Sequence, residues 1–382
     1  MTISPILPGA TLGMLGGGQL GRMFTMAART MGYRVIVLDP DPHSPAGAIA
    51  NLHLEAEYLH ERALDGMAGE CAAVSTEFEN VPGEALARLA PHCAVRPAAD
   101  AVAPTQNRLA EKGFLDAHDL PTALWAPVRG AGDLTAALAH VGTPAVLKRA
   151  QGGYDGKGQA PVATPGEAET AFAALGGEPC ILERRIALAR ELSVIVCRAA
   201  DGTVACYPPG ENVHADAILA TTRVPAPIDE ALDGRATEIA AAAATALDYC
   251  GVLGVELFVA ADGALMVNEL APRPHNSGHY TLDACATDQF EQQVRLLCGL
   301  APGSTELLRP AAMVNLLGDL WGDGDPDWTR VFDRAGAKLH LYGKREPRPG
   351  RKMGHVNVLA DDADTALDTA RTILRELGGR PE

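Results

Sequence analysis

The dipeptide Asp262-Gly263 stands between two apolar segments, Val252 to Val259 and Leu265 to Leu270, and favours a two-residue turn that joins two strands into a hairpin. In such a hairpin, residues equally far from the turn lie opposite each other. Glu256 lies six residues before Asp262, and Glu269 lies six residues after Gly263. The two carboxylates are therefore expected to face each other on one side of an antiparallel strand pair.

Two like charges that face each other across a sheet destabilise it unless a cation lies between them or one is protonated. Magnesium is the economical explanation, because Mg²⁺ in nucleotide enzymes is usually bound by one or two carboxylates together with phosphate and water. Asn268 is near enough to add an amide oxygen, although strict alternation puts it on the opposite strand face. The alternative is an exposed hairpin with two solvated glutamates. A loop longer than the turn that pairs Ala261 with Ala264 would shift the register.

The first hundred or so residues alternate apolar runs with helical segments, which predicts an open, mostly parallel sheet. Thr11 to Leu38 form one strand–helix–strand unit, with a helix over Gln19 to Met31. The turn before that helix, Gly16 to Gly21, contains G-x-G-x-x-G, and Asp39 ends the following strand. Dinucleotide binding, with Asp39 on a ribose hydroxyl, and a tight turn without a ligand both remain open.

Length and charge limit the classes of protein. A chain of 382 residues is long enough for two or three domains, and its formal net charge of -16 disfavours nucleic acid and anionic membranes as partners. Any phosphate site must therefore be a local cationic patch. The eight cysteines form no C-x-x-C pair and indicate a reducing compartment, so we expect a cytoplasmic protein. No apolar run approaches the roughly 20 residues that a membrane span needs.

A second cluster of candidate residues begins where the apolar strand Ala145 to Leu147 ends in Lys148 and Arg149. The segment that follows, residues 151–159, has four glycines and one lysine, Lys157. Lys148 on a rigid strand suits inner phosphates, and a glycine loop with free amides suits a triphosphate. The G-x-x-x-x-G-K-[ST] pattern of a Walker A loop is absent. A glycine-rich surface hairpin is the alternative.

Two glutamates come after this loop. Glu183 ends an apolar strand and precedes a connector whose main chain is suited to read an adenine edge, and Glu191 opens the next strand, where it is a candidate for ribose hydroxyls. Solvated surface charges explain both residues equally well.

These pieces occur in a characteristic order: lysine strand, glycine loop, two glutamates, then a carboxylate hairpin. Five motifs add to the order, namely Gly17-Gly18-Gln19-Leu20-Gly21-Arg22-Met23, Thr76-Glu77-Phe78-Glu79-Asn80-Val81-Pro82, Gly152 to Gln159, Asn268-Glu269-Leu270-Ala271-Pro272-Arg273-Pro274-His275-Asn276-Ser277-Gly278-His279 and Pro349-Gly350-Arg351-Lys352-Met353-Gly354-His355. On these residues the chain resembles, over essentially its full length, the 5-(carboxyamino)imidazole ribonucleotide synthase family of the ATP-grasp superfamily. Arg184-Arg185 and the additional Gly16 depart from the family pattern.

The resemblance implies a mixed α/β and α+β chain with an ATP-grasp fold, an N-terminal Rossmann-like parallel sheet and a small C-terminal β-rich domain. The expected boundaries are 1–106 for the Rossmann-like domain, 107–305 for the ATP-grasp domain, with a lid over about 120–182, and 306–382 for the C-terminal domain.

The resemblance also implies roles for individual residues. ATP would be bound by Arg108, Lys148, Gly153, Tyr154, Asp155, Gly156, Lys157, Gly158, Gln159, Glu183, Arg184, Arg185, Ile186, Glu191, His214, Asn268 and Glu269. Mg²⁺ would be held by Glu256 and Glu269. The aminoimidazole ribonucleotide would be surrounded by Gln19, Leu20, Glu77, Tyr154, Asp155, Arg273, Lys344, Arg351 and Lys352. The candidates for catalysis and for orienting bicarbonate are Lys148, Arg273, His275, Asn276 and His279.

The implied reaction joins bicarbonate to 5-aminoimidazole ribonucleotide at the expense of ATP, in a protein that is commonly a homodimer. Three other functions stay open: a formate-dependent glycinamide ribonucleotide transformylase, an NAD-dependent oxidoreductase built on Gly16 to Gly21, and a non-catalytic ribonucleotide-binding regulator.

Overall fold

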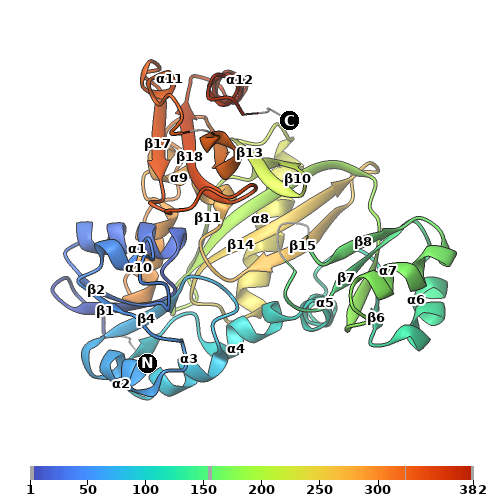
Figure 1. Ribbon diagram of the computed structural model, residues 1–382, viewed down its shortest axis with the longest axis horizontal. Helices are drawn as coiled ribbons and strands as arrows, with labels where there is room; N and C mark the ends of the chain where they lie inside the picture. Colours follow the sequence, from blue (N-terminus) through green and yellow to red (C-terminus); the bar gives the residue numbers. More distant parts are fainter. Residues whose placement is uncertain (1–3, 154–156, 323, 380–382) are drawn as a thin grey trace.

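The computed structural model describes residues 4–153, 157–322 and 324–379, which form three sheets (Figure 1). The N-terminal sheet is parallel throughout, as its alternating pattern predicts. Its strands, in spatial order, are β3 (Leu52–Leu54), β2 (Arg34–Leu38), β1 (Thr11–Leu15), β4 (Ala73–Thr76) and β5 (Ala94–Val95). The expected open, parallel N-terminal sheet is therefore present.

Helices cover both faces of this sheet, because both faces are apolar. Helices α2 (Glu61–Glu70) and α3 (Gly83–Leu89) bury Leu64 and Leu86 in one core. On the other face, α1 (Gln19–Thr30) shares a core with α10 (Gln289–Leu297), which comes from far along the chain. The N-terminal region is thus completed by a helix from the central region.

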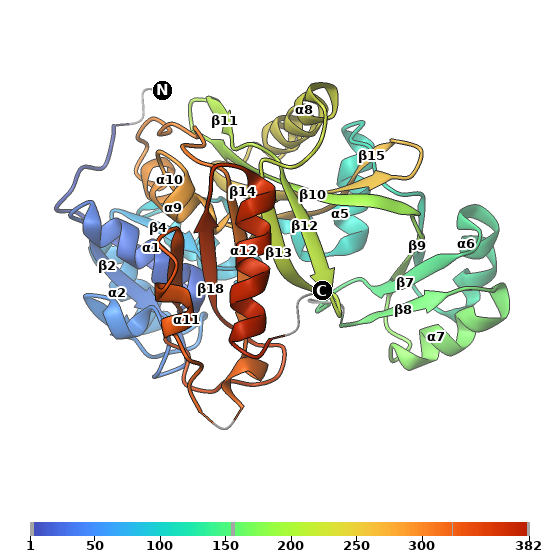
Figure 2. The ribbon, with the colours of Figure 1, turned by 90° about the horizontal axis from the view of Figure 1, so that it is seen from above.

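The segment expected to form the lid, about residues 120–182, contains a small antiparallel sheet that projects from the body (Figures 1 and 2). Its strands are β6 (Trp125–Val128), β9 (Cys180–Arg184), β7 (Ala145–Arg149) and β8 (Gln159–Val162), and its helices are α6 (Leu134–Val141) and α7 (Ala168–Ala174). These elements have an apolar core of their own. Such a core lets the lid keep its shape independently of the body.

A nine-stranded sheet forms the centre of the molecule and continues into the C-terminal region. Its strands are β15 (Leu265–Ala271), β14 (Gly251–Ala260), β10 (Leu188–Arg198), β12 (Gly210–Ala215), β13 (Ile218–Val224), β16 (Ala311–Leu317), β18 (Lys352–Leu359) and β17 (Ala337–Leu341), with β11 (Val204–Cys206) beside β10. The remaining α-helices are α4 (Ala99–Val102), α5 (Arg108–Ala117), α8 (Glu230–Ala246), α9 (Thr281–Ala284), α11 (Thr329–Phe332) and α12 (Ala363–Glu376). Because β13 pairs with β16, main-chain hydrogen bonds join the central region to the C-terminal region.

The hairpin of β14 and β15 differs from the predicted one at its turn. The connection has three residues, Ala261 to Gly263, and Ala260 N–H donates to Ala264 O at 2.8 Å. The prediction that Ala261 pairs with Ala264 was therefore wrong. The chain adopts the longer loop because Gly263, at φ 84°, supplies the left-handed residue that three-residue hairpins require.

A β-bulge at Asn268 compensates for the longer turn. Leu257 pairs with Val267, but the next pair is Glu256 with Glu269, so Asn268 is an extra residue on β15. The prediction that the two glutamates lie opposite each other is confirmed, although the route differs: the turn shifts the register by one residue and the bulge restores it.

None of the helices in the described ranges has the length and apolar character that a membrane crossing requires.

The close approach of α1 to the turn before it explains Gly21. A Cβ atom at this position would lie 2.6 Å from Gly16 O, which is main chain and has no alternative rotamer. We expect Gly21→Ala to lower the free energy of unfolding by about 1–3 kcal/mol through overpacking. Gly66→Ala, on the exposed side of α2 with nothing within 4 Å, is the control and should raise it by roughly 0.5–1 kcal/mol. Urea unfolding measures both, and equal stability of the two variants would contradict this account.

Candidate active site

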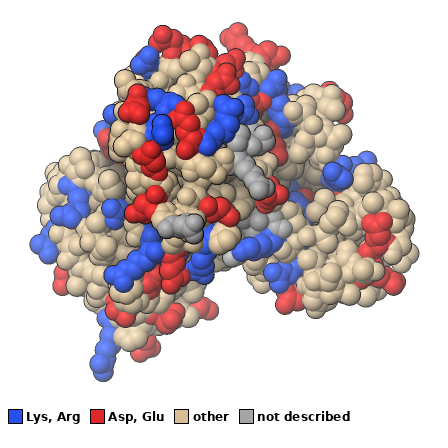
Figure 3. Space-filling view, turned by 45° about the horizontal axis from the view of Figure 1, so that its top comes forward, with Lys and Arg blue, Asp and Glu red and all other residues tan. Residues whose placement is uncertain are grey.

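A cleft of about 730 Å³ lies where the N-terminal region, the lid, the central sheet and the C-terminal strands meet. Helix α5 and strands β14 and β15 line one side, and Gln19 and Glu77 from the N-terminal region line another. Lys344 and Lys352 reach it from the C-terminal region. Figure 3 shows basic side chains interspersed with acidic ones over one face, without one large basic area, so positive charge for an anion is local.

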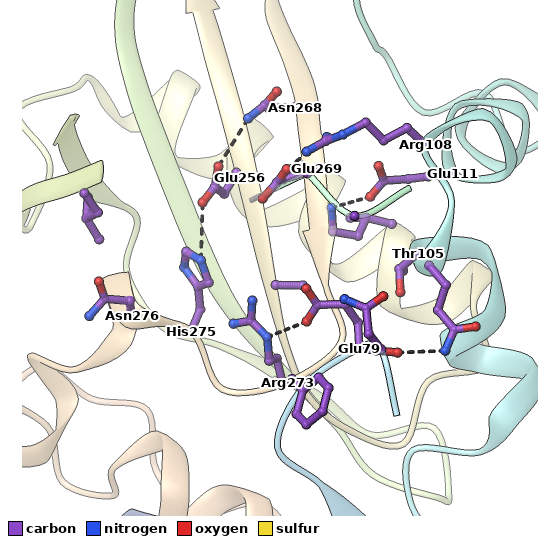
Figure 4. Close-up of a pocket in the computed structure, with 18 of the residues that line it drawn as sticks. Glu79, Thr105, Arg108, Glu111, Glu256, Asn268, Glu269, Arg273, His275 and Asn276 are labelled. Carbon is purple, nitrogen blue, oxygen red and sulfur yellow. Dashed lines mark hydrogen bonds and ion pairs between the residues drawn. The ribbon is translucent and has the colours of Figure 1, made fainter. Parts of the chain in front are cut away.

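The opposed glutamates lie inside this cleft (Figure 4). Glu256 accepts a hydrogen bond from Asn268 Nδ2 at 3.2 Å, and His275 Nε2 lies 3.3 Å from its other oxygen. Glu269 accepts one from the Arg108 guanidinium at 3.2 Å. Burial, followed by the charge of Glu269, raises the pKa of Glu256 to about 7. The pair is thus under electrostatic stress that a cation would relieve.

The bulge changes what Asn268 can do. As the extra residue on β15, it departs from strict alternation, and its amide reaches Glu256 on the glutamate side of the strand. The expectation that Asn268 lies on the opposite face was wrong, because bulges re-aim side chains.

The donor set suits a divalent cation that also binds a nucleotide. Two carboxylate oxygen donors face each other, and Mg²⁺ prefers oxygen. No group of three or more His, Cys, Asp or Glu side chains in the described part of the chain is arranged to hold a metal ion. A magnesium ion at Glu256 and Glu269 would therefore need phosphate or water oxygens to complete its coordination.

A neighbouring cavity of about 590 Å³ lies between the lid and the central sheet. It is lined by the connector from Glu183 to Leu188, by Lys148 and by Phe258 of β14. Lys148 Nζ donates to Glu183 Oε2 at 2.7 Å. Burial favours the neutral acid, but Lys148 and then Lys112 outweigh it and lower the pKa of Glu183. The cavity therefore combines an apolar wall with a charged pair at one end.

Glu191 and His214 face each other from β10 and β12, with 2.8 Å between Glu191 Oε2 and His214 Nδ1, and both line the main cleft. Burial lowers the pKa of His214, but the hydrogen bond and charge of Glu191 outweigh it, and the net shift is upward.

The first glycine loop does not offer a dinucleotide site. The Glu77 carboxylate accepts hydrogen bonds from the main-chain N–H groups of Gly18 and of Leu20, the latter at 3.0 Å. Asp39 accepts one from Gly17 N–H at 2.7 Å and another from Tyr58. The protein's own carboxylates thus occupy the amides at the start of α1, so the NAD-dependent alternative was wrong.

Models of three families match the chain in order. The ribonucleotide synthetase preATP-grasp domain matches residues 9–106, the ATP-grasp domain matches 113–290, and the phosphoribosylaminoimidazole carboxylase C-terminal domain matches 311–369.

Two relatives that match over nearly their whole length carry the same name. N5-carboxyaminoimidazole ribonucleotide synthase of Bacillus subtilis is 42% identical over 94% of this chain and 94% of its own. The enzyme of the same name from Brucella melitensis is 44% identical over 93% of this chain and 98% of its own. The chain belongs to the N5-carboxyaminoimidazole ribonucleotide synthase family.

Solved structures of this family have the same fold. The Staphylococcus aureus synthetase in complex with ADP has a TM-score of 0.91 at 34% identity, over 98% of this chain and 99% of that one. The Aspergillus clavatus synthase in complex with ADP and 5-aminoimidazole ribonucleotide has a TM-score of 0.87 at 32% identity, over 97% and 98%.

Most residues that the family resemblance selects line the two cavities. The main cleft is lined by Gln19, Leu20, Glu77, Arg108, Lys148, Gly153, Gln159, Glu191, His214, Glu256, Asn268, Glu269, Arg273, His275, Asn276, Lys344 and Lys352. The neighbouring cavity is lined by Lys148, Gln159, Glu183, Arg184, Arg185 and Ile186. Tyr154, Asp155 and Gly156 lie outside the described residues. Lys157 and Gly158 follow them in the glycine loop, and Gly158 packs against the side chain of Arg149.

Three family-selected residues have side chains that are bound within the protein. Arg184 Nε and one terminal nitrogen both donate to Val141 O at the end of α6, which fastens the side chain to α6. Arg351 donates to Glu346 O. Unlike Lys344 and Lys352, it is not among the described residues that line the main cleft.

His279 is the third. Its ring is fully buried, its Nδ1 accepts a hydrogen bond from Gln289 Nε2 at 3.0 Å, and its centroid lies 4.8 Å from that of the His355 ring. His279 is not among the described residues that line the cleft, because the chain enters the protein interior after Asn276, at the buried residues Ser277 and Gly278.

Sequence reasoning did not select three charged residues that lie in or beside the cleft. Glu79 binds the Arg273 guanidinium at 2.7 Å, and Glu111 and Lys112 of α5 are buried against β15. The spacing of Arg108, Glu111 and Lys112 places all three on one helix face, which is the signal that was available.

The Glu191–His214 pair gives a pH prediction. A histidine whose folded pKa is raised stabilises the fold below its unfolded pKa and loses that contribution as pH rises through the folded pKa. We expect NMR titration to give His214 a pKa above ~6.5, and Glu191→Gln to bring it below that value, because burial then dominates. His43, an exposed histidine, is the control. A pKa of His214 that does not respond to Glu191→Gln would contradict the assignment.

Proposed function

We propose that the chain catalyses the ATP-dependent carboxylation of 5-aminoimidazole ribonucleotide by bicarbonate, giving N5-carboxyaminoimidazole ribonucleotide, ADP and phosphate. The observation that carries the proposal is the opposed pair Glu256 and Glu269, which shares one cleft with Lys148 and with the Gln19–Lys344 contact. A metal-nucleotide site and a site for a second phosphorylated ligand thus adjoin each other. The family's complexes with ADP and with 5-aminoimidazole ribonucleotide support the same pair of ligands.

ATP would occupy both cavities. Its base would lie beside the connector Glu183 to Ile186, its ribose near Glu191 and His214, and its phosphates near Lys148, Arg108 and the glycine loop. Glu256 and Glu269 would hold Mg²⁺, which, when bound, supplies positive charge against the phosphate oxygens. Phosphoryl transfer depends mostly on such positioning and charge neutralisation.

Bicarbonate is a poor electrophile and needs activation. Its oxygen attacks the γ-phosphorus of ATP, the bond from that phosphorus to the β–γ bridging oxygen breaks, and ADP leaves. The exocyclic amine then forms a bond to the carboxyl carbon, phosphate leaves, and the nitrogen loses one proton. Arg273, His275 and Asn276 line the cleft and follow β15, the strand that carries Glu269 and is called the metal strand below. These three residues are proposed to orient bicarbonate. Closure of the lid, about residues 120–182, would keep water from the short-lived carboxyphosphate.

The ribonucleotide would lie at the N-terminal side of the cleft. Lys344 Nζ donates to Gln19 Oε1 at 2.8 Å and to Lys352 O at 2.7 Å, so a cationic side chain from the C-terminal region meets the first residue of α1. A phosphate monoester suits this local positive charge in an otherwise acidic chain. We further propose Tyr154 and Asp155 as ribonucleotide ligands, a homodimer as the assembly and the cytoplasm as the location.

The reaction itself is the first test. With MgATP, we expect ADP release to require both bicarbonate and 5-aminoimidazole ribonucleotide, since the phosphoryl acceptor and the amine must both be present for turnover. Coupled spectrophotometric detection of ADP measures it. Formate with glycinamide ribonucleotide is the control for the nearest alternative reaction. Stimulation by that pair, and not by the first, would overturn the proposal.

Glu269→Gln tests the metal pair. The amide keeps the shape of the side chain but removes its charge, so we expect kcat to fall at least about a hundredfold. The melting temperature should not fall, because one of two facing like charges is gone. Glu238→Gln, on the exposed side of α8, is the matched control and should leave kcat unchanged. A Glu269→Gln variant with normal turnover at low magnesium would refute the assigned role.

A further inference from the structure

Strand β15 carries Glu269 but is the outermost strand of the nine-stranded sheet. On its outer side β15 has, among the described residues, only an isolated bridge between Val267 and Thr122, where Val267 N–H donates to Pro121 O at 2.7 Å. The bulge at Asn268 interrupts its pairing with β14 on the other side. At a bulge the strand has a competing register one residue away, which contacts outside the ladder must disfavour. A slip of one residue that removed the bulge would put Asn268 opposite Glu256 and turn Glu269 to the other face.

Helix α5 lies along this edge, and three of its charged side chains hold consecutive residues of β15. Arg108 binds the Glu269 carboxylate, and Glu111 Oε1 accepts a hydrogen bond from Leu270 N–H at 2.7 Å. Lys112 Nζ donates to Asn268 O at 2.9 Å and lies 3.4 Å from Val267 O. The side chains of α5 thus replace, at the bulge, the main-chain hydrogen bonds that a further strand would have made.

Lys112 also joins this edge to the lid. Its ammonium donates to Thr122 Oγ1 at 2.7 Å, in the segment that leads into β6, and lies 3.9 Å from Glu183 Oε1 on β9. The other oxygen of Glu183 binds Lys148. One buried ammonium therefore contacts the metal strand, the entry to the lid and the lid strand that carries Glu183.

Burial of the Lys112 ammonium lowers the stability of the fold unless its contacts compensate. The side chain is 1% exposed, and Lys112 is not among the described residues that line the main cleft. Taking an ammonium out of water is unfavourable, and an apolar side chain of similar volume is often as good for stability alone. Contacts to three separate segments are what an apolar residue would not provide.

We infer that Lys112 is a positioning residue for the metal strand: its ammonium holds the Asn268 bulge in register, keeps Glu256 and Glu269 opposite each other, and ties that register to the lid through Glu183. The inference deepens the proposed function and rests on it for the kinetic readout only. Lys112 acts through β15 and does not itself touch the nucleotide.

Lys112→Met is the principal test, because methionine keeps most of the volume and removes all three hydrogen-bond donors. Isothermal titration calorimetry with ADP, in magnesium and in EDTA, gives the gain in affinity that magnesium supplies. We expect this gain to shrink at least tenfold in the variant, and amide hydrogen exchange over residues 265–271 to accelerate at least tenfold. In turnover, kcat should fall at least tenfold while KM for ATP changes little, and Lys112→Arg should recover part of the loss.

Leu115→Ala is the matched control, since it removes a fully buried side chain from the same helix without removing a hydrogen bond to β15. It should lower the melting temperature but keep the magnesium-dependent gain. Thr122→Val is the milder variant, should Lys112→Met not fold. It removes one partner of the ammonium together with the hydrogen bond from Thr122 Oγ1 to Val267 O at 3.1 Å, and the magnesium-dependent gain should fall several-fold.

A folded Lys112→Met protein that keeps both the magnesium-dependent gain and the slow exchange of residues 265–271 would overturn the inference, as would changes no larger than those in Leu115→Ala. If Lys112→Met does not fold, an unchanged gain in Thr122→Val overturns it. The two failures are distinguishable: a wild-type protein that binds MgADP but does not carboxylate 5-aminoimidazole ribonucleotide disproves the proposed function and leaves the calorimetric and exchange tests standing.

Discussion

Repulsion between two carboxylates in one buried cleft is the constraint on which the rest of the site depends. Glu256 and Glu269 are held opposite each other by strand pairing, and burial raises the pKa of Glu256 to about 7. A chain selected for stability alone would separate them or replace one. Their neighbours reduce the strain only in part: Arg108 pairs with Glu269, and the Asn268 amide donates to Glu256. A site arranged in this way is complementary to a divalent cation bound with an anionic ligand.

Several elements of the fold place positively charged side chains in the cleft, although the surface as a whole is not basic. Lys148 comes from the lid, Arg108 from α5, and Lys344 from beyond β17, while the formal net charge of the chain is -16. Cations at short range inside a cleft stabilise phosphate oxygens far more than distant charges do, because solvent screens the distant ones. Continuity of the central sheet with the C-terminal strands keeps Lys344 at a fixed position relative to β14.

Sequence patterns predicted the features that periodicity and turn chemistry determine locally, and they failed where distant contacts decide. The parallel sheet follows from alternation, and the facing of Glu256 and Glu269 follows from an Asp-Gly turn. The three-residue loop and the bulge were not predicted, but the register shift of the loop is cancelled by that of the bulge, so the glutamates still face each other. The helical spacing of Lys112 was visible, but its partners were not, since they lie 10, 71 and 156 residues away at Thr122, Glu183 and Asn268.

The first glycine loop shows why a motif needs its surroundings. Added Cβ atoms at Gly17 and Gly18 would lie 2.6 Å from Ser44 and 2.4 Å from a Glu77 oxygen, so these glycines admit protein side chains rather than a pyrophosphate. The start of α1 still binds an anion, as a helix N-terminus should. That anion is the Glu77 carboxylate, which also lines the cleft. The same physical preference that holds a dinucleotide in other proteins here fixes a cleft residue in place, and this orients Gln19, the next residue after Gly18, toward Lys344.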